Sequence, residues 1–350
     1  MGLRILHSAD WHLDSPFASF SEEQRSFLKQ AQRQIPEKIA LICRQQKCDL
    51  VLLAGDLFDG PWSRTTLDQV REALKECGVP VMIAPGNHDP WGVDCPWAEF
   101  WPENVHIFGK ELESVALQSL DCRVFGAGFS QMDCQSLLEG FHAEGEETWK
   151  IGLFHGDPTN VNSHYNPITM AQIRKSGLSY LALGHVHTAG ALEALNTVCG
   201  WPGCPMGRGW DETGEKGCLL VDLNQTAVLE PYVLDLPGFF RETVDFNRLP
   251  EILPPAGNRN FYKITLEGYG KPDLKAISER YRDYPNLKLI DHTIDPEKLW
   301  IQAGEDSLQG TYFGKLKEAA ESADPETQKK ILLAAEISRM LLEGREVELP

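Results

Sequence analysis

The sequence predicts an α+β protein, in which a layered α/β domain is followed by a smaller α+β domain. Between residues 2 and 240, short apolar runs alternate with longer amphipathic segments, which is the pattern of strands and covering helices. After Leu183 the pattern changes to short strands separated by Gly- and Pro-rich turns, which favours antiparallel pairing. A chain of 350 residues with 42% hydrophobic content can bury two cores.

The elements of the first domain follow from this periodicity. Apolar residues at helical spacing predict a helix over residues 22–46, interrupted by Pro36, and another over residues 65–77. Residues 200–217 are predicted to form a loop. The predicted strands are residues 3–8, 50–54, 81–84, 124–126, 151–154, 181–184, 190–195, 218–223 and 227–236.

A domain boundary is predicted near residues 236–246, where Pro237-Gly238 interrupts the chain and the Pro254–Gly257 stretch lies just beyond. We therefore divide the chain into residues 1–240 and 241–350. In the last helix, Leu333, Ile337, Met340 and Leu341 share a face, which predicts docking on a core or on a partner. The predicted elements of the second domain are strands 261–268, 287–290 and 299–302, a helix over residues 272–281, and two helices in the tail.

Charge and cysteine content narrow the class of protein. With 33 basic and 51 acidic residues the net charge is −18, which argues against a broadly basic nucleic-acid-binding surface. A phosphate substrate is still compatible with this charge, because bound divalent cations reverse the local field. The nine cysteines include no C-x-x-C pair, as expected for reduced thiols. No apolar run approaches the ~18 residues of a membrane span, so we predict a cytoplasmic protein without membrane association.

Residues that bind metals or transfer protons follow five of the predicted strands. Ligand sites of open α/β sheets form at the carboxyl ends of strands, so these loops are expected to converge. Asp10 and His12 are two residues apart, and on an extended segment both side chains would point to the same side. In chain order the residues are Asp10 and His12; Asp56 and Asp59; Asn87, His88 and Asp89; His155; and His185 and His187.

Each of these residues has a structural interpretation when it is considered alone. Asp56 is a candidate turn cap, Asn87 a turn residue, and His155 a core or surface histidine. Five such groups in order, each behind an apolar run, favour a metal centre instead. Three Asp or Asn oxygens and four His nitrogens suit two divalent ions, Mn²⁺ first, with Mg²⁺, Fe or Zn²⁺ as alternatives. Two ions about 3.5–4 Å apart activate water for in-line displacement at phosphorus, so the predicted reaction is phosphoester hydrolysis.

The motifs D-x-H, G-D-x-x-D, G-N-H-D, H and G-H-x-H appear in this order, and the chain resembles the calcineurin-like metallophosphoesterases. The segments HSADWHLDSPF, LLAGDLFD, VMIAPGNHDP, LALGHVH and PGCPMGRGWDETGEKGCLLVDL more closely resemble the DNA repair exonucleases of the SbcD-like and YhaO-like group. This resemblance covers about residues 3–235. It implies a four-layer α/β/β/α sandwich, followed by a small cap domain that helps place DNA over the metals.

The resemblance also implies roles for individual residues. His88 would stay unligated and act as general acid or stabilise negative charge at the scissile phosphate. Asp59 stands where archaeal and eukaryotic relatives have a histidine, and would orient a ligand. Asp89 would orient a ligand or cap the turn before Pro90, and Arg208 would contact phosphate or form a surface ion pair. One metal would be held by Asp10, His12, Asp56 and His187, and the other by Asp56, Asn87, His155 and His185.

Three functional hypotheses follow. The first is a metal-dependent DNA exonuclease subunit that acts with an SbcC-like ATPase. Residues 328–342 of this chain would form part of the surface that binds the ATPase. Relatives also dimerise through helices of the phosphoesterase domain. The second is a phosphodiesterase or phosphatase for small nucleotides or other phosphoesters, which the acidic balance favours. The third is a scaffold with vestigial metal sites, against which the complete ligand set argues.

Overall fold

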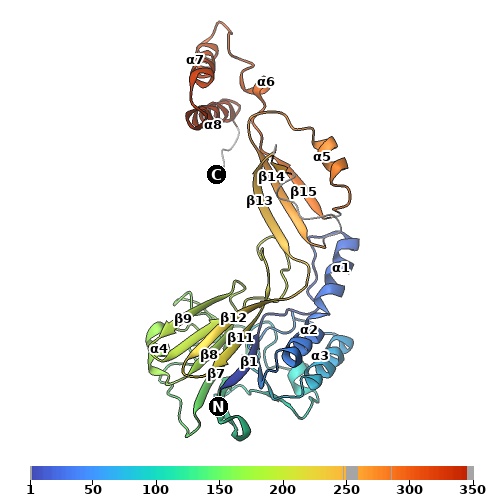
Figure 1. The fold of residues 1–350 in the computed structure, drawn as a ribbon, viewed down its shortest axis with the longest axis vertical. Coiled ribbons are helices and arrows are strands. Elements are labelled where there is room, and N and C mark those ends of the chain that lie inside the picture. Colours follow the sequence, from blue (N-terminus) through green and yellow to red (C-terminus); the bar gives the residue numbers. More distant parts are fainter. Residues whose placement is uncertain (1, 247, 250–258, 285, 345–350) are drawn as a thin grey trace. The chain divides into compact units, whose positions relative to one another are not determined.

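The computed structural model describes residues 2–246, 248–249, 259–284 and 286–344 (Figure 1). The chain divides into two compact units between Phe239 and Phe240, within strand β13 (Phe239–Asp245). The Pro254–Gly257 stretch that we assigned to the linker lies outside the described residues. Within the described ranges, we find no helix with the length and apolar character needed to cross a membrane.

The first unit begins with a six-stranded sheet in the order β12-β11-β1-β2-β3-β4. Its four N-terminal strands are parallel, whereas β11 and β12 are added antiparallel beside β1. Pro231 lies in β12, an edge strand, where a missing N–H leaves no ladder bond unmade. The strands are β1 (Leu3–Ser8), β2 (Leu50–Leu53), β3 (Val81–Ile83), β4 (Val105–Ile107), β11 (Gly217–Leu223) and β12 (Ala227–Val233).

A second six-stranded sheet has the order β5-β6-β7-β8-β10-β9, with antiparallel strands only at its two edges. The prediction that residues 200–217 form a loop is wrong at its start, because Gly200 and Trp201 end β10 (Thr197–Trp201). Pairing of β10 with β8 and β9 outweighs the turn preference of Gly200. The other strands are β5 (Glu113–Leu117), β6 (Cys122–Ala127), β7 (Trp149–His155), β8 (Tyr180–Gly184) and β9 (Gly190–Ala194).

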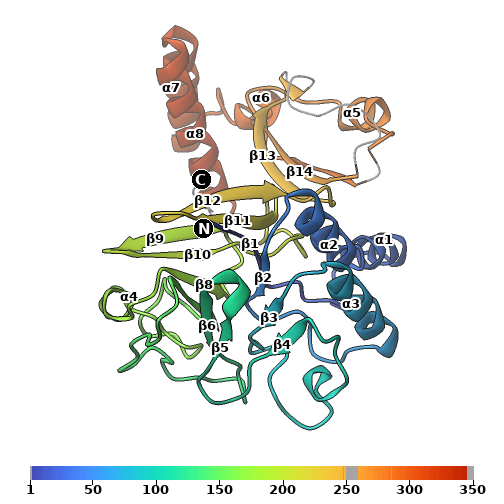
Figure 2. The same ribbon diagram turned by 60° about the horizontal axis from the view of Figure 1, so that its bottom comes forward.

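The main core lies between these two sheets. In β2, Leu50 and Leu52 enter this core, whereas Val51 and Leu53 are buried on the opposite face, as the two-residue period of a strand requires. A second core covers the outer face of the second sheet and includes Ile173 of helix α4 (Met170–Lys175). The layers therefore follow the predicted α/β/β/α order. The helices beside the first sheet are α1 (Glu22–Gln32), α2 (Ile35–Gln45) and α3 (Arg64–Glu76) (Figure 2).

The predicted interruption near Pro36 is confirmed. Helix α1 (Glu22–Gln32) ends before α2 (Ile35–Gln45), and Pro36 occupies the first turn of α2, where its missing N–H has no partner to lose. Helix α3 (Arg64–Glu76) begins at Ser63, whose hydroxyl accepts from the Thr66 N–H. The amide of Gln32 donates to the His12 carbonyl at 2.7 Å and so ties α1 to the loop after β1.

The second unit contains a three-stranded sheet in the order β13-β14-β15, with β14 (Phe261–Glu267) parallel to β15 (Leu287–Asp291). Helix α5 (Leu274–Arg280) packs on the core of this sheet through Ile277. The strand predicted at residues 299–302 is wrong, because Leu299 ends helix α6 (Pro296–Leu299). The missed signal is Asp295-Pro296: the Asp295 carboxylate accepts from the Glu297 N–H at 3.0 Å, and Pro favours the first helical position.

Helices α7 (Leu308–Ser322) and α8 (Pro325–Leu342) pack together around a small core of their own. The residues that α8 buries there are Leu332 and Ala335. Of the face that we predicted to dock, Leu333 and Leu341 are exposed. The core-docking interpretation is therefore wrong for these two leucines.

Gly184 ends β8 of the second sheet and lies against Ala54, the residue after β2 of the first sheet. A Cβ at Gly184 would stand 2.0 Å from the Ala54 carbonyl oxygen, a backbone atom that side-chain rotation does not move. We expect Gly184→Ala to reduce the free energy of unfolding of the metal-free protein by about 1–3 kcal/mol through overpacking. Urea denaturation measures this, with Gly92→Ala as control because nothing lies within 4 Å of its Cβ position. Equal stability of the two variants would contradict the prediction.

Candidate metal centre

The loops after β1 and β2 run side by side and hold unusual backbone conformations. The Asp10 N–H donates to the Gly55 carbonyl at 3.0 Å, and the His12 N–H to the Asp56 carbonyl at 2.9 Å. Asp10, His12 and Asp56 have φ angles of 54°, 46° and 54°. The extended geometry that we expected for Asp10 and His12 is therefore wrong. Left-handed residues other than Gly cost about 1–3 kcal/mol each and are concentrated at functional sites.

Two contacts fix the carboxylates of these loops against neighbouring strands. The His185 N–H, just after β8 of the second sheet, donates to both Asp10 carboxylate oxygens at 3.0 and 3.1 Å. The His88 N–H donates to Asp56 Oδ1 at 2.8 Å. Gly86 permits this approach, because a Cβ there would lie 2.1 Å from Asp56 Oδ1. Hydrogen bonds from loops at the ends of both sheets thus hold the carboxylates of Asp10 and Asp56.

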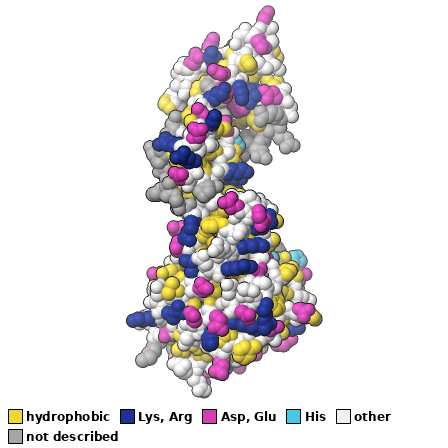
Figure 3. Space-filling model, turned by 90° about the vertical axis from the view of Figure 1, so that its right-hand side faces the viewer, with side chains coloured by type: hydrophobic (Ala, Val, Ile, Leu, Met, Phe, Trp, Pro, Cys, Tyr) yellow, Lys and Arg dark blue, Asp and Glu magenta, His cyan; other side chains and the backbone are white. Residues whose placement is uncertain are grey.

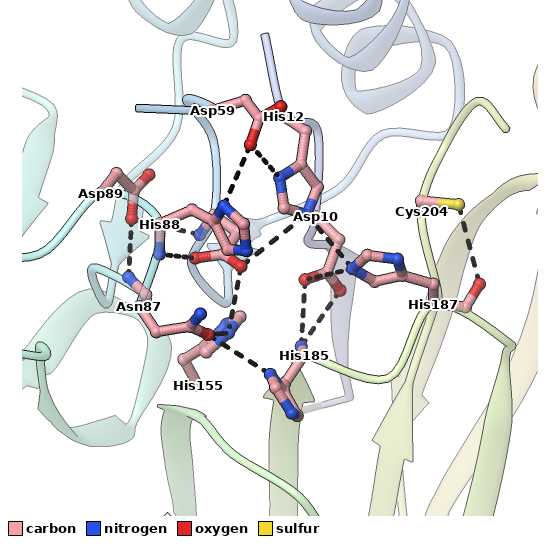
Figure 4. A network of polar contacts seen from close by, with 12 residues as sticks. Asp10, His12, Asp59, Asn87, His88, Asp89, His155, His185, His187 and Cys204 are labelled. Carbon is pink, nitrogen blue, oxygen red and sulfur yellow. Dashed lines mark hydrogen bonds and ion pairs between the residues drawn. The ribbon is translucent and has the colours of Figure 1, made fainter. Parts of the chain in front are cut away.

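One group of donor atoms is formed by Asp10, His12 and His187 (Figure 4). Asp56 lies beside this group. His12 Nε2 lies 3.1 Å from His187 Nε2 and 3.7 Å from Asp56 Oδ2. His187 Nε2 lies 3.8 Å from Asp10 Oδ1. Side chains from three loops far apart in the sequence therefore place nitrogen and oxygen atoms next to one another.

A second group adjoins the first through Asp56. His155 Nε2 lies 3.3 Å from Asp56 Oδ2 and 2.9 Å from Asn87 Oδ1. His185 Nδ1 lies 3.3 Å from the same Asn87 oxygen. The structure thus brings together all seven side chains that the sequence indicated as ligands, with Asp56 between the two groups.

The outward-facing ring nitrogens of two histidines have acceptor partners. His155 Nδ1 lies 2.8 Å from the Ala54 carbonyl, and His187 Nδ1 lies 2.7 Å from Glu212 Oε1. His12 Nδ1 faces Asp59 Oδ1 at the longer distance of 3.4 Å. Carboxylate and carbonyl oxygens only accept, so Nδ1 of His155 and Nδ1 of His187 each carry a hydrogen, and Nε2 is the ring nitrogen that faces the site. Metal-binding histidines are held in this way.

The charges of the site fit divalent cations. Asp10 and Asp56 are each only 1% exposed, and isolated buried carboxylates are costly without positive charge. Burial by itself lowers the pKa of His155, but the charge and hydrogen bond of Asp56, together with the Asp10 charge and the Ala54 carbonyl, raise this pKa to about 9. The site therefore attracts positive charge. Carboxylate and amide oxygens with imidazole nitrogens form a donor set for divalent metals.

His88 lies at the open side of the site, with its side chain 41% exposed. Its Nδ1 is 3.0 Å from Asp59 Oδ1, and this hydrogen bond raises the pKa of His88. Burial opposes ionisation of Asp59, but hydrogen bonds from His12, His88 and Ser15 hold its pKa below the usual range. Asp59 thus contacts both an expected ligand and His88. His88 also comes close enough to His12 and Asp56 to form a third donor group.

Asp89 is buried and faces the backbone, away from the donor atoms. Its carboxylate accepts from the N–H groups of Gly86 at 2.7 Å, Asp56 at 3.2 Å, Leu57 at 2.6 Å and Phe58 at 3.2 Å. Burial, followed by the neighbouring Asp56 charge, raises the pKa of Asp89 to about 7. Asp89 therefore joins the loops after β2 and β3, which carry Asp56 and Asn87.

Arg208 lies beside the first donor group. Its guanidinium Nη2 is 2.7 Å from Glu212 Oε1, and Nη1 is 3.8 Å from Asp59 Oδ2. Sequence reasoning missed Glu212. The available signal was a carboxylate four residues after the arginine that we selected, within a Gly-rich segment between two strands.

The model of the calcineurin-like phosphoesterase family matches residues 3–189, more than half of the chain. The chain therefore belongs to the calcineurin-like phosphoesterases. It is 33% identical over 234 residues to the uncharacterized metallophosphoesterase YhaO of Bacillus subtilis, covering 63% of this chain and 57% of that protein. The SbcD chain of the nuclease SbcCD of Bacillus subtilis is 22% identical over 266 residues, covering 63% and 66%. The chain thus spans less than two thirds of the length of these relatives.

Solved structures with similar folds include a dimetal phosphatase of Danio rerio, with a TM-score of 0.43 and 13% identity over 65% of this chain and 95% of that one. Another is TT1561 of Thermus thermophilus, with a TM-score of 0.41 and 14% identity over 66% of this chain and 99% of that one.

Proposed function

We propose that this calcineurin-like phosphoesterase hydrolyses phosphodiesters with two divalent metal ions and acts on DNA as an exonuclease. The observation that supports this most strongly is the convergence of seven nitrogen- and oxygen-bearing side chains beside His88. Mn²⁺ is the proposed ion because the donors combine carboxylate oxygen with imidazole nitrogen, and Mg²⁺, Fe and Zn²⁺ are the alternatives. One ion would be held by Asp10, His12, Asp56 and His187, and the other by Asp56, Asn87, His155 and His185.

When bound, the two ions supply a water of lowered pKa and polarise the phosphoryl group. The chain's own contribution centres on His88. Because Asp59 occupies Nδ1 of His88, the other ring nitrogen is available to the substrate. A protonated His88 can then donate a hydrogen bond or a proton to an oxygen of the scissile phosphate as negative charge develops.

Two observations bear on the substrate. The similarity to the SbcD chain of the nuclease SbcCD supports DNA, and we propose residues 1–240 as the nuclease domain and residues 241–350 as a cap that helps place DNA. The net charge of −18 favours a small nucleotide or another phosphoester. On the face shown in Figure 3, Lys and Arg side chains are interspersed with Asp and Glu. Hydrolysis of DNA and hydrolysis of a small phosphodiester therefore have to be compared directly.

The deciding experiment incubates the Mn²⁺-loaded protein with end-labelled duplex DNA and, in parallel, with bis-p-nitrophenyl phosphate. We expect turnover of both substrates, and loss of both activities with excess EDTA. Hydrolysis of the small diester without DNA degradation would overturn the exonuclease proposal and favour the small-substrate enzyme. If a protein with two bound ions hydrolysed neither, the vestigial scaffold would be favoured.

We also propose a partner protein, an ATPase of the SbcC-like type, that docks on α8. The exposed Leu333 and Leu341 support this, because the core shared by α7 and α8 does not use them. A homodimer formed through helices of the first unit is a second assembly that sedimentation would detect. The nine free cysteines fit a reducing cytoplasm, which is the compartment that we propose.

A further inference from the structure

We propose that Glu212 is a positioning residue, which holds His187 as a metal ligand and, through Arg208, fixes Asp59 beside His12 and His88. This inference rests on the metal centre proposed above. It concerns how the chain orients its ligands, so it is testable without any substrate.

The first step concerns the proton on His187. Glu212 Oε1 lies 2.7 Å from His187 Nδ1, a distance at which one of the two atoms must carry hydrogen. Both oxygens of Glu212 also accept from Arg208, Oε1 from Nη2 at 2.7 Å and Oε2 from the backbone N–H at 2.7 Å. Glu212 is thus the acceptor on both oxygens, and the hydrogen lies on His187 Nδ1.

The distance of 3.2 Å between Arg208 Nη2 and His187 Nδ1 does not require Nδ1 to be an acceptor. A guanidinium nitrogen is only a donor, and a protonated Nδ1 is also a donor, so these atoms are neighbours that share an acceptor. That acceptor is Glu212 Oε1, which lies 2.7 Å from each of them. With Nδ1 protonated, the His187 Nε2 lone pair faces His12 Nε2 and Asp10.

The second step concerns how Glu212 itself is held. Its other oxygen, Oε2, accepts from the Arg208 backbone N–H at 2.7 Å and from Arg208 Nε at 3.3 Å. Both carboxylate oxygens are therefore bonded to one arginine, a paired geometry that restricts rotation. A ligand histidine supported by a fixed carboxylate loses less rotational freedom when it binds a metal.

The third step extends the contacts to the other ligand loop. Arg208 Nη1 lies 3.8 Å from Asp59 Oδ2, and Ser15 donates to the same oxygen at 2.7 Å. Asp59 Oδ1 is the atom that faces both His12 and His88. Glu212, Arg208 and Asp59 therefore form one chain of charges that reaches two expected ligands and the expected general acid.

The test is Glu212→Gln, which keeps the side-chain shape and removes the charge. Isothermal titration of the metal-stripped protein with Mn²⁺ is expected to show one site weakened by about 10–100-fold, as for other residues that support metal ligands. The other site should keep its affinity. Turnover of bis-p-nitrophenyl phosphate should fall at low Mn²⁺ and recover when Mn²⁺ is raised. Wild-type affinity at both sites in Glu212→Gln would overturn the inference.

Three further variants make the result specific. Glu215→Gln removes an exposed carboxylate from the same loop and should leave Mn²⁺ binding unchanged. His187→Ala gives the Mn²⁺ affinity that remains when the ligand is lost completely. Glu212→Gln should weaken the same Mn²⁺ site. Arg208→Gln should also lower Mn²⁺ affinity if Arg208 positions Glu212. If it raised only the KM for the diester, Arg208 would contact phosphate and the proposed chain of charges would be wrong.

Metal-free unfolding in urea accompanies each titration, so that a loss of folding is not mistaken for a loss of ligand orientation. Different results would refute the proposed function and the role proposed for Glu212. A protein that binds two Mn²⁺ ions but hydrolyses no diester would refute the function and leave the role of Glu212 measurable.

Discussion

Replacing His88 with alanine is expected to lower kcat for phosphodiester hydrolysis by about 10²–10⁴-fold, the usual contribution of general acid–base catalysis. Two Mn²⁺ ions per chain should remain, because the seven proposed ligands are untouched. The loss of kcat is expected from the position of His88. Asp59 holds Nδ1 of His88, and the side chain is 41% exposed at the open side of the site. Steady-state kinetics at saturating Mn²⁺ and metal analysis of the same sample measure both quantities.

A matched control is His164→Ala, which removes an exposed histidine from another loop. Its kcat should equal that of the unsubstituted protein. Two outcomes would refute the role proposed for His88. An unchanged kcat would show that His88 takes no part in the reaction, and a loss of bound Mn²⁺ would make it a ligand beside His12 and Asp56.

The order of the metal-site residues could be predicted because each follows a short apolar strand. Parallel strands place their carboxyl ends at one edge, so Asp10, Asp56 and Asn87 had to meet at the first sheet. What periodicity does not encode is the approach of the second sheet. That approach depends on Gly184, where a side chain would collide with the Ala54 carbonyl.

Other features were missed for physical reasons that differ from one another. Strand β4 (Val105–Ile107) is short and only half-buried, so its residues give no clear alternating pattern. The left-handed Asp10 and His12 follow from hydrogen bonds to the loop after β2, which is a tertiary effect. Glu212 lies in a segment without periodicity, and only its contacts with His187 and Arg208 distinguish it from the exposed Glu215.

The largest loss of activity is expected for Asp56→Asn, because Asp56 lies between the two donor groups. Its Oδ2 is 3.7 Å from His12 Nε2 and 3.3 Å from His155 Nε2. The amide oxygen can still accept from the His88 N–H, as Asp56 Oδ1 does at 2.8 Å, so the loop should keep its shape. The change therefore removes a buried negative charge from both proposed metal sites at once.

We expect fewer than one Mn²⁺ per chain in Asp56→Asn and a fall in kcat/KM of at least about 10³-fold. Metal ions contribute several kcal/mol to transition-state stabilisation, and each 1.4 kcal/mol corresponds to a factor of ten. Metal analysis after dialysis and diester kinetics test this, with Asp133→Asn as an exposed control. If Asp56→Asn retained two ions, Asp56 would not bridge them. If it bound one ion tightly, Asp56 would belong to one site only, and the two donor groups would act as separate metal sites.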